Sequence, residues 1–136
     1  MVEHNHRTLQ CVVVTPERAV LDEACDFIAL PMYDGELGVA PDRLPLIGRL
    51  GFGELRIVKG GQTRSLYVDG GFVQVRANVV TVLTSKAVAA SEIKTDKALE
   101  VLRSPKVETT PEGQEAQLKN QQRARAQLRI AQKQQA

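Results

Sequence analysis

Between about residues 8 and 84 the chain alternates apolar with polar positions, and this period of two predicts short β-strands with one buried face. Leu9, Cys11 and Val13 share one phase of the first run, and Leu55 and Ile57 share one phase of a later run. The remaining β-rich runs lie at positions 27–30, 66–68, 72–75 and 79–83. We therefore expect an N-terminal β domain.

Glycines and prolines divide these runs into strands. The pair Gly60-Gly61 separates two of them, and because both residues accept a positive φ, the pair predicts a tight hairpin. Asp69-Gly70-Gly71 and Ala77-Asn78 are expected to form two further turns. The strands after residue 53 should then run as an antiparallel meander, within a sandwich or barrel and not a parallel sheet.

From about Ser91 the pattern becomes that of two helices. Ser91 or Thr95 can cap the first helix, since an acidic residue follows each of them, and Pro105 should end it. The sequence Thr110-Pro111-Glu112 predicts a second start, with threonine as the cap and proline in the first helical position. The C-terminal region is therefore expected to be an antiparallel two-helix hairpin.

The second helix has a narrow apolar seam. Ala124, Leu128 and Ala131 follow one another at i, i+4 and i+7, with Leu118 to one side, and glutamines occupy much of the remaining surface. A helix with so little to bury is marginal without packing. We expect this hairpin to be detachable from the β domain.

Composition fits a chain with a real core and no membrane span. Of its 136 residues, 43% are hydrophobic and 25% are charged, and no apolar run approaches the roughly 20 residues that cross a bilayer. We expect any membrane association to occur through protein partners. Cys11 and Cys25 are expected to be buried thiols in a reducing compartment, and the terminal pair His4 and His6 is not expected to bind metal.

The positive charge is concentrated at the C-terminus. Residues 116–136 hold five basic side chains and no acidic one, whereas the whole chain has a formal charge of only +2. The second helix should therefore favour an acidic partner.

Catalytic and cofactor motifs are missing from the sequence. It has no GxSxG elbow, no Walker-type phosphate loop and no HExxH pair, and we expect no catalytic residue, no cofactor and no metal site. Asp34, Glu36 and Asp42 do not have the spacing of a calcium loop and are interpreted as parts of a solvated turn. The surrounding stretch, residues 30–48, is rich in proline and glycine and predicts an ordered loop, used either for recognition or for closing one edge of the sandwich.

This stretch carries a family resemblance. The sequence DGELGVAPDRLPLIG at residues 34–48 closely resembles the loop of F-type ATP synthase epsilon subunits that reads roughly [DE]GE[LI]G[VI]xPxHxPL. Segments 9–18, 53–59, 68–75 and 78–83 resemble further strands of that family in the same order, and residues 126–129 resemble its second helix. The chain is thus similar to bacterial-type epsilon subunits from residue 8 to residue 131.

The resemblance implies a fold and a place in a complex. The fold is an antiparallel β-sandwich of about ten strands, here residues 1–88, followed by a regulatory helical hairpin, residues 89–136. The implied function is that of a non-catalytic rotor subunit in the central stalk, coupling proton or Na⁺ flow through the ring of c subunits to ATP synthesis. The implied partners are the gamma subunit, the c-ring and the alpha and beta subunits. The implied location is peripheral, on the cytoplasmic face of the bacterial plasma membrane.

The resemblance also implies contact residues. The family loop that touches the c-ring corresponds to Gly35, Glu36, Leu37 and Gly38, with Glu36 as the ring-contacting carboxylate. Contact with gamma is expected at Pro41, Arg43, Pro45 and Leu46. In the family the hairpin either folds against the sandwich or extends and inhibits ATP hydrolysis, and Arg123, Arg125 and Arg129 are expected to meet an acidic segment of the beta subunits. A solvated helix face is the alternative for these arginines.

Two departures from the family pattern limit this transfer. Arg43 and Leu44 stand where many members have histidine and alanine, which changes the expected contact with gamma. Some members bind ATP through an aspartate followed closely by Arg-Ala, whereas here Asp96 is followed by Lys97-Ala98 and the phosphate-binding arginine is replaced by Leu99. We therefore do not expect regulatory ATP binding.

Two other functional classes are alternatives to this one. A stand-alone sandwich module with a basic, nucleic-acid-binding tail would use the five C-terminal cations for phosphate. Aromatic residues make up only 4% of the chain and tryptophan is absent, so stacking platforms for bases are scarce, and no nucleic-acid partner is expected. A small hydrolase lacks an assembled set of catalytic groups.

Overall fold

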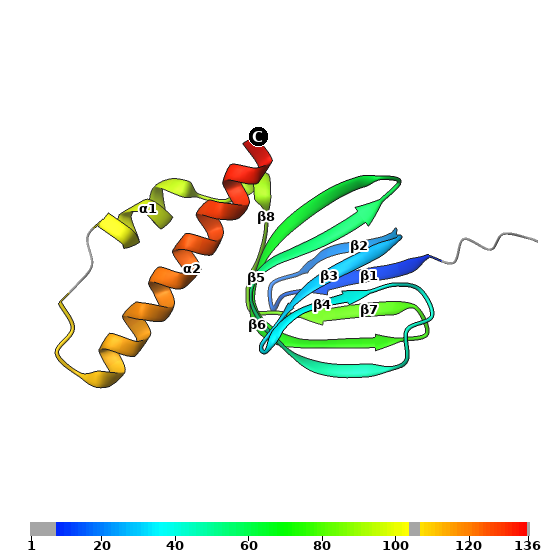
Figure 1. The fold of residues 1–136 in the computed structure, drawn as a ribbon, viewed down its shortest axis with the longest axis horizontal. Coiled ribbons are helices and arrows are strands. Elements are labelled where there is room, and N and C mark those ends of the chain that lie inside the picture. The colour runs from blue at the N-terminus through cyan, green and yellow to red at the C-terminus, as the bar shows by residue number, and fades with distance from the viewer. Residues whose placement is uncertain (1–7, 104–106, 136) are drawn as a thin grey trace, which may run out of the picture.

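The computed structural model describes residues 8–103 and 107–135. A β-sheet folds over on itself, and two helices pack beside it (Figure 1). The strands are β1 (Leu9–Val14), β2 (Ala19–Cys25), β3 (Phe27–Met32), β4 (Gly35–Val39), β5 (Leu46–Lys59), β6 (Gln62–Arg76), β7 (Val79–Leu83) and β8 (Ala87–Ala89). A short 3₁₀ helix, η1 (Ala90–Glu92), leads into α1 (Thr95–Arg103) and α2 (Pro111–Gln135).

The strands follow the order β2-β1-β7-β6-β5-β3-β4, and β8 pairs with β6. β5, β6 and β7 form the expected antiparallel meander. β1 and β7 pair in parallel, whereas the other recorded strand pairs are antiparallel. The predicted fold class, a β domain followed by two helices packed together, is confirmed.

The described residues contain eight strands, fewer than the expected ten or so, because β5 and β6 are long and bent. They have 14 and 15 residues, and Gly53 in β5 and Gly70 and Gly71 in β6 have φ values of 148°, 73° and 110°. Such values allow a strand to bend without ending. Each long strand therefore contributes to both halves of the folded sheet (Figure 1).

These glycines also overturn one predicted turn. Asp69-Gly70-Gly71 does not reverse the chain but bends β6. The other two predicted turns are confirmed: Gly60 and Gly61, with φ of 57° and 79°, join β5 to β6, and Ala77 and Asn78, with φ of 51° and 64°, join β6 to β7.

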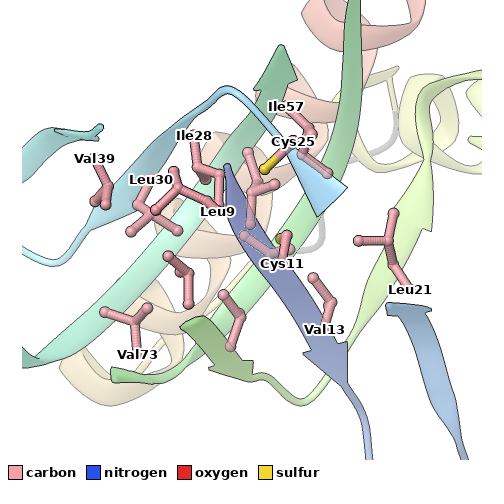
Figure 2. Close-up of a cluster of buried hydrophobic side chains, with 14 of the residues drawn as sticks. Leu9, Cys11, Val13, Leu21, Cys25, Ile28, Leu30, Val39, Ile57 and Val73 are labelled. Atoms are coloured by element: carbon pink, nitrogen blue, oxygen red, sulfur yellow. The ribbon is translucent and has the colours of Figure 1, made fainter. Parts of the chain in front are cut away.

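The predicted alternation produces the core. Leu9, Cys11 and Val13 are buried, and they point into the same cluster as side chains from β2, β3 and β5 (Figure 2). The two cysteines are confirmed as buried. Burial is the main cause that raises the pKa of Cys11 to about 12 and that of Cys25 to about 11, so both remain neutral thiols at neutral pH.

Both helices begin where the sequence indicated. α1 starts at Thr95, one of the two residues predicted as its cap, which here is the first helical residue; the other, Ser91, lies in η1. At the start of α2 the backbone N–H of Gly113 donates to Thr110 Oγ1 at 3.0 Å, which is the expected N-cap. The predicted helix stop at Pro105 lies outside the described residues.

α2 uses two faces, of which the sequence revealed only one. In the predicted seam Ala124 and Ala131 are buried and Leu128 is half-buried, while Leu118 is exposed. The second face packs on the sheet, where Ile130 joins a separate buried cluster with Tyr67 and η1; its members are Tyr67, Ala90, Ala126 and Ile130, flanked by Phe52 and Ile93. In this structure the hairpin is therefore folded against the β domain.

Candidate functional site

The predicted ring-contacting loop forms β4, an edge strand of the sheet. It turns back along β3, pairing Gly35 with Met32 and Glu36 with Pro31. Glu36 is exposed, and its Oε1 accepts a hydrogen bond from Arg56 Nη2 at 2.6 Å. The carboxylate is thus held above the sheet in a charge-assisted bond while remaining open to solvent.

The other three residues of this loop shape it. Leu37 is half-buried and packs against the core. A Cβ on Gly38 would lie 2.7 Å from the Phe27 ring, so glycine allows that ring to cover the strand. Gly35 has a φ of 134°, which glycine adopts readily. Of the four predicted ring residues, Glu36 alone combines a charge with an exposed side chain.

The predicted gamma-contacting segment follows as an ordered loop. Its position is set by Asp42, whose backbone N–H donates to Asn78 Oδ1 at 2.6 Å and whose Oδ1 accepts from Asn78 Nδ2 at 3.3 Å. Asp42 has a φ of 68°, which aspartate tolerates better than most residues do. These two hydrogen bonds tie the loop to the β6–β7 turn. Arg43 and Pro45 are exposed, while Pro41 and Leu46 are half-buried.

An exposed apolar face beside this loop was not predicted. Ile47, Phe72 and Leu83 are 76%, 60% and 52% exposed, and Phe72 is paired directly with Leu83. We call these three residues the outer apolar face. Next to them Arg49 pairs with Phe72, and its guanidinium lies 4.0 Å from the centre of the Tyr33 ring. The sequence does hold a signal: these apolar residues occupy the phase of their strands that polar residues normally fill.

The three predicted inhibitory arginines do not share one environment. Arg123 Nε lies 3.1 Å from each carboxylate oxygen of Asp69, and its guanidinium carbon lies 5.2 Å from the centre of the Phe52 ring. Arg125 and Arg129 are exposed. Arg123 therefore binds the β domain in this structure, while the other two face solvent.

A second ion pair between the hairpin and the sheet was also missed. Lys133 Nζ lies 3.0 Å from Glu54 Oε1, and Ser65 Oγ donates to Glu54 Oε2 at 2.7 Å. Burial opposes ionisation of Glu54, but the Ser65 hydroxyl and the Lys133 ammonium outweigh it and hold the pKa of Glu54 below its usual value. The basic face of α2 thus meets two carboxylates of its own β domain.

The chain was compared with known families and proteins. Residues 8–90 match the family model described as ATP synthase, Delta/Epsilon chain, beta-sandwich domain. An ATP synthase epsilon chain from Rhodopirellula baltica is 45% identical over 126 residues, which cover 91% of this chain and 98% of that protein. The chain belongs to the ATP synthase epsilon-chain family. Another epsilon chain, from Nitratidesulfovibrio vulgaris (strain Miyazaki F), is 39% identical over 92 residues, or 68% of this chain and 69% of that protein.

Solved structures agree on the fold of this epsilon chain. A chain in the Tetrahymena thermophila mitochondrial ATP synthase central stalk and c-ring structure aligns with a TM-score of 0.72 and 16% identity, covering 92% of this chain and 97% of that one. A chain in the Euglena gracilis mitochondrial ATP synthase structure aligns with a TM-score of 0.62 and 21% identity, covering 92% and 78%. Identities this low support the fold alone.

Family membership confirms the resemblance seen in the sequence. A member of this family is an epsilon subunit of ATP synthase and not one of its catalytic subunits. Family membership favours this function over that of a stand-alone nucleic-acid-binding module. In the part of the chain that the structure describes, no helix is long and apolar enough to cross a membrane.

Proposed function

We propose that this epsilon subunit links the c-ring to gamma through its β domain and restrains ATP hydrolysis through its hairpin. The observation that carries the proposal is the separation of exposed features on the fold. An acidic edge strand and an apolar face belong to the β domain, and exposed arginines belong to a hairpin with its own weak packing. We assign one of these features to each proposed partner.

The proposed ring contact is the edge strand β4 with its side chain Glu36, together with Gly35, Leu37 and Gly38. Arg56 holds the carboxylate in one place, so it meets a polar partner loop without first losing conformational freedom. An exposed charge of this kind contributes orientation and association rate more than affinity. The proposed role of Glu36 is therefore to orient the contact with the ring, not to supply its binding affinity alone.

The proposed gamma contact is the loop with Pro41, Arg43, Pro45 and Leu46, extended by the outer apolar face. Exposed apolar side chains that lie together on one face are typical of protein interfaces. The loop is already ordered by Asp42 and Asn78, which lowers the entropy that binding would cost. Rim charges from Arg43 and Arg49 complement this apolar centre.

The proposed inhibitory contact uses Arg125 and Arg129, joined by Arg123 when the hairpin leaves the sheet. α2 meets the β domain through one small buried cluster and two partly exposed ion pairs, so little free energy separates its docked and released positions. The intact complex would hold this subunit at the cytoplasmic face of the bacterial plasma membrane. Either protons or Na⁺ are compatible with this role.

Substitution of Glu36 tests the ring contact in the assembled enzyme. We expect Glu36→Gln to weaken retention of the subunit on c-ring-containing membranes by up to about fivefold, and to lower ion pumping per ATP hydrolysed. Glu23→Gln is the matched control, because Glu23 is also paired with an arginine, Arg64, at 3.0 Å. Equal behaviour of the two variants would remove Glu36 from the contact.

Deletion of residues 89–136 tests the hairpin. We expect faster ATP hydrolysis by the assembled enzyme, while binding to gamma stays unchanged because the loop and the outer apolar face remain. Hydrolysis at the wild-type rate would show that the hairpin does not inhibit this enzyme. Loss of binding to gamma would instead move the gamma contact from the β domain to the helices.

A further inference from the structure

We propose that Asp69 of β6 competes with the external acidic partner for Arg123, and so restrains inhibition by keeping that arginine on the β domain. The inference rests on the proposed inhibitory role of the hairpin and adds the device that opposes it. The guanidinium of Arg123 can pair either with Asp69 of its own chain or with the acidic surface of the proposed partner. In this structure it pairs with Asp69.

Asp69 is held in place by hydrogen bonds within the β domain. Its backbone N–H donates to Lys86 O at 3.1 Å and to Thr84 Oγ1 at 3.2 Å, and its carbonyl oxygen accepts from Ser85 Oγ at 2.6 Å. The Tyr67 hydroxyl donates to Asp69 Oδ2 at 3.2 Å. With a side chain only 20% exposed, Asp69 is a pre-positioned acceptor.

Arg123 fits this acceptor on several sides. Nε lies 3.1 Å from both Asp69 oxygens, Nη1 donates to Asn120 Oδ1 at 3.2 Å, and the guanidinium carbon lies 5.2 Å from the centre of the Phe52 ring. Carboxylate pairing and contact with an aromatic ring are the two interactions that arginine makes best. While Arg123 occupies this position, its guanidinium is not available to a second carboxylate surface.

The neighbouring arginines set the contrast. Arg125 and Arg129 lie one turn apart on α2 and are exposed in the docked hairpin. Docking therefore hides one of the three proposed inhibitory cations and leaves two outside. Release of α2 from Asp69 then frees Arg123 and makes all three proposed inhibitory arginines available at once.

This arrangement predicts opposite effects from the two sides of one ion pair. Removing the charge of Asp69 weakens docking and leaves Arg123 ready for the external partner, so inhibition should increase. Removing the charge of Arg123 also weakens docking, but it removes one inhibitory cation, so inhibition should not increase. A purely structural ion pair would give the same change from either side.

The docking half of the inference is tested with the full-length chain in isolation. Fluorescent labels on Gln62→Cys and Gln132→Cys, both at exposed positions, report the distance from α2 to the β domain. We expect Asp69→Asn and Arg123→Gln each to raise the released-to-docked ratio about fivefold to tenfold, as the loss of a charge-assisted hydrogen bond requires. Arg123→Gln leaves the β domain unaltered, so its shift remains interpretable if Asp69→Asn folds poorly.

The competition half is tested by ATP hydrolysis in the assembled enzyme. We expect Asp69→Asn to slow hydrolysis below the wild-type rate, whereas Arg123→Gln and the Asp69→Asn/Arg123→Gln double variant stay at or above it. Glu23→Gln, which removes a carboxylate paired with Arg64 and not with α2, should change neither the distance nor the rate.

Each failure has a separate meaning. If Asp69→Asn matches Glu23→Gln in the label distance, Asp69 does not hold the hairpin and the inference is overturned. If the distance shifts but Asp69→Asn and Arg123→Gln change hydrolysis alike, competition for Arg123 is overturned. If deletion of residues 89–136 leaves hydrolysis unchanged, the proposed inhibitory function fails, whatever the label distances show.

Discussion

Gly71 illustrates how a single residue determines the shape of the β domain. It has a φ of 110°, and a Cβ at this position would overlap the carbonyl oxygen of Leu83 and lie 2.9 Å from its carbonyl carbon. We expect Gly71→Ala to lower the free energy of unfolding by about 3 kcal/mol or more, because strain adds to a backbone clash. Urea denaturation of the purified chain measures this loss.

The neighbouring Gly70 is the matched control for that substitution. It also has a positive φ, 73°, but a Cβ there meets nothing within 4 Å. Gly70→Ala should therefore cost only the conformational strain, about 1 kcal/mol. Similar losses from both substitutions would mean that the contact between β6 and β7 at Leu83 is not tight.

The charge of Glu54 predicts a pH dependence of hairpin docking. Ser65 on β6 and Lys133 on α2 overcome the opposing effect of burial, with help from Arg56 on β5, and hold the pKa of Glu54 below its usual 4.5. A group with a lowered pKa in the folded state stabilises that state above its unfolded pKa and loses the effect as the pH falls. The contribution of Glu54 should therefore be complete at neutral pH and decline below pH 4.5.

Glu54→Gln tests this expectation through the difference in free energy of unfolding from the wild type. We expect a gap of about 1 kcal/mol at pH 7, since the partner Lys133 is largely exposed, and a smaller gap at pH 3.5. Glu115→Gln is the control, as Glu115 forms an exposed i, i+4 pair with Lys119 at 3.6 Å. A gap that stays constant with pH would show that the lost side-chain packing, not the charge, stabilises docking.

At the residue scale, the sequence predicted burial better than it predicted partners. The alternation of Leu55 and Ile57 requires no knowledge of the fold, and both are buried. The pairing of Arg123 with Asp69 joins residues 54 positions apart and depends on how α2 lies on the sheet. Local patterns carry no information on that arrangement. The same reason explains why the Lys133 and Glu54 pair was missed.

Among the elements, the cap of α2 was fully readable from sequence and can be tested directly. Thr110 Oγ1 accepts from the backbone N–H of Gly113 at 3.0 Å. We expect Thr110→Ala to cost about 1 kcal/mol of helix stability, whereas Thr110→Ser should keep most of it. Hydrogen exchange of the first-turn amides of α2 measures the effect. Equal exchange in both variants would show that the cap bond does not stabilise the helix.

Elements that bend or pack twice were harder to predict. Glycines at positions 70 and 71 look like a turn in a local window, but the ladder between β5 and β6 continues on either side of them, so the strand bends instead. α2 has one seam that follows the helical period and a second formed by Ala126 and Ile130. The second was missed because two apolar residues among glutamines and arginines have no clear period.

The outer apolar face was missed for the opposite reason, since strands with apolar residues in both phases resemble fully buried ones.

For the whole molecule, the main core lies entirely within the strands. Its buried members run from Leu9 to Val82, and among the described residues the hairpin shares with the strands the small cluster around Tyr67 and Ile130. We therefore predict that a chain shortened to residues 1–90 folds cooperatively without the hairpin. It should lose about 2 kcal/mol of unfolding free energy, because Tyr67 and Phe52 become exposed. Calorimetry should still detect a single transition.

The exact end of the independent unit is tested by shortening the chain two residues further. Residues 1–88 form the predicted domain, but this cut removes Ala89, which pairs with Leu66 in the β6–β8 ladder. If the domain ends at residue 88, the two shortened chains should have the same melting temperature, and both should bind gamma as the full-length chain does. If residues 1–88 melt several degrees below residues 1–90, β8 belongs wholly to the β domain and the unit ends at Ala90. Loss of a cooperative transition in both would show that the hairpin is part of one folding unit, and its release for inhibition would then require the β domain to loosen as well.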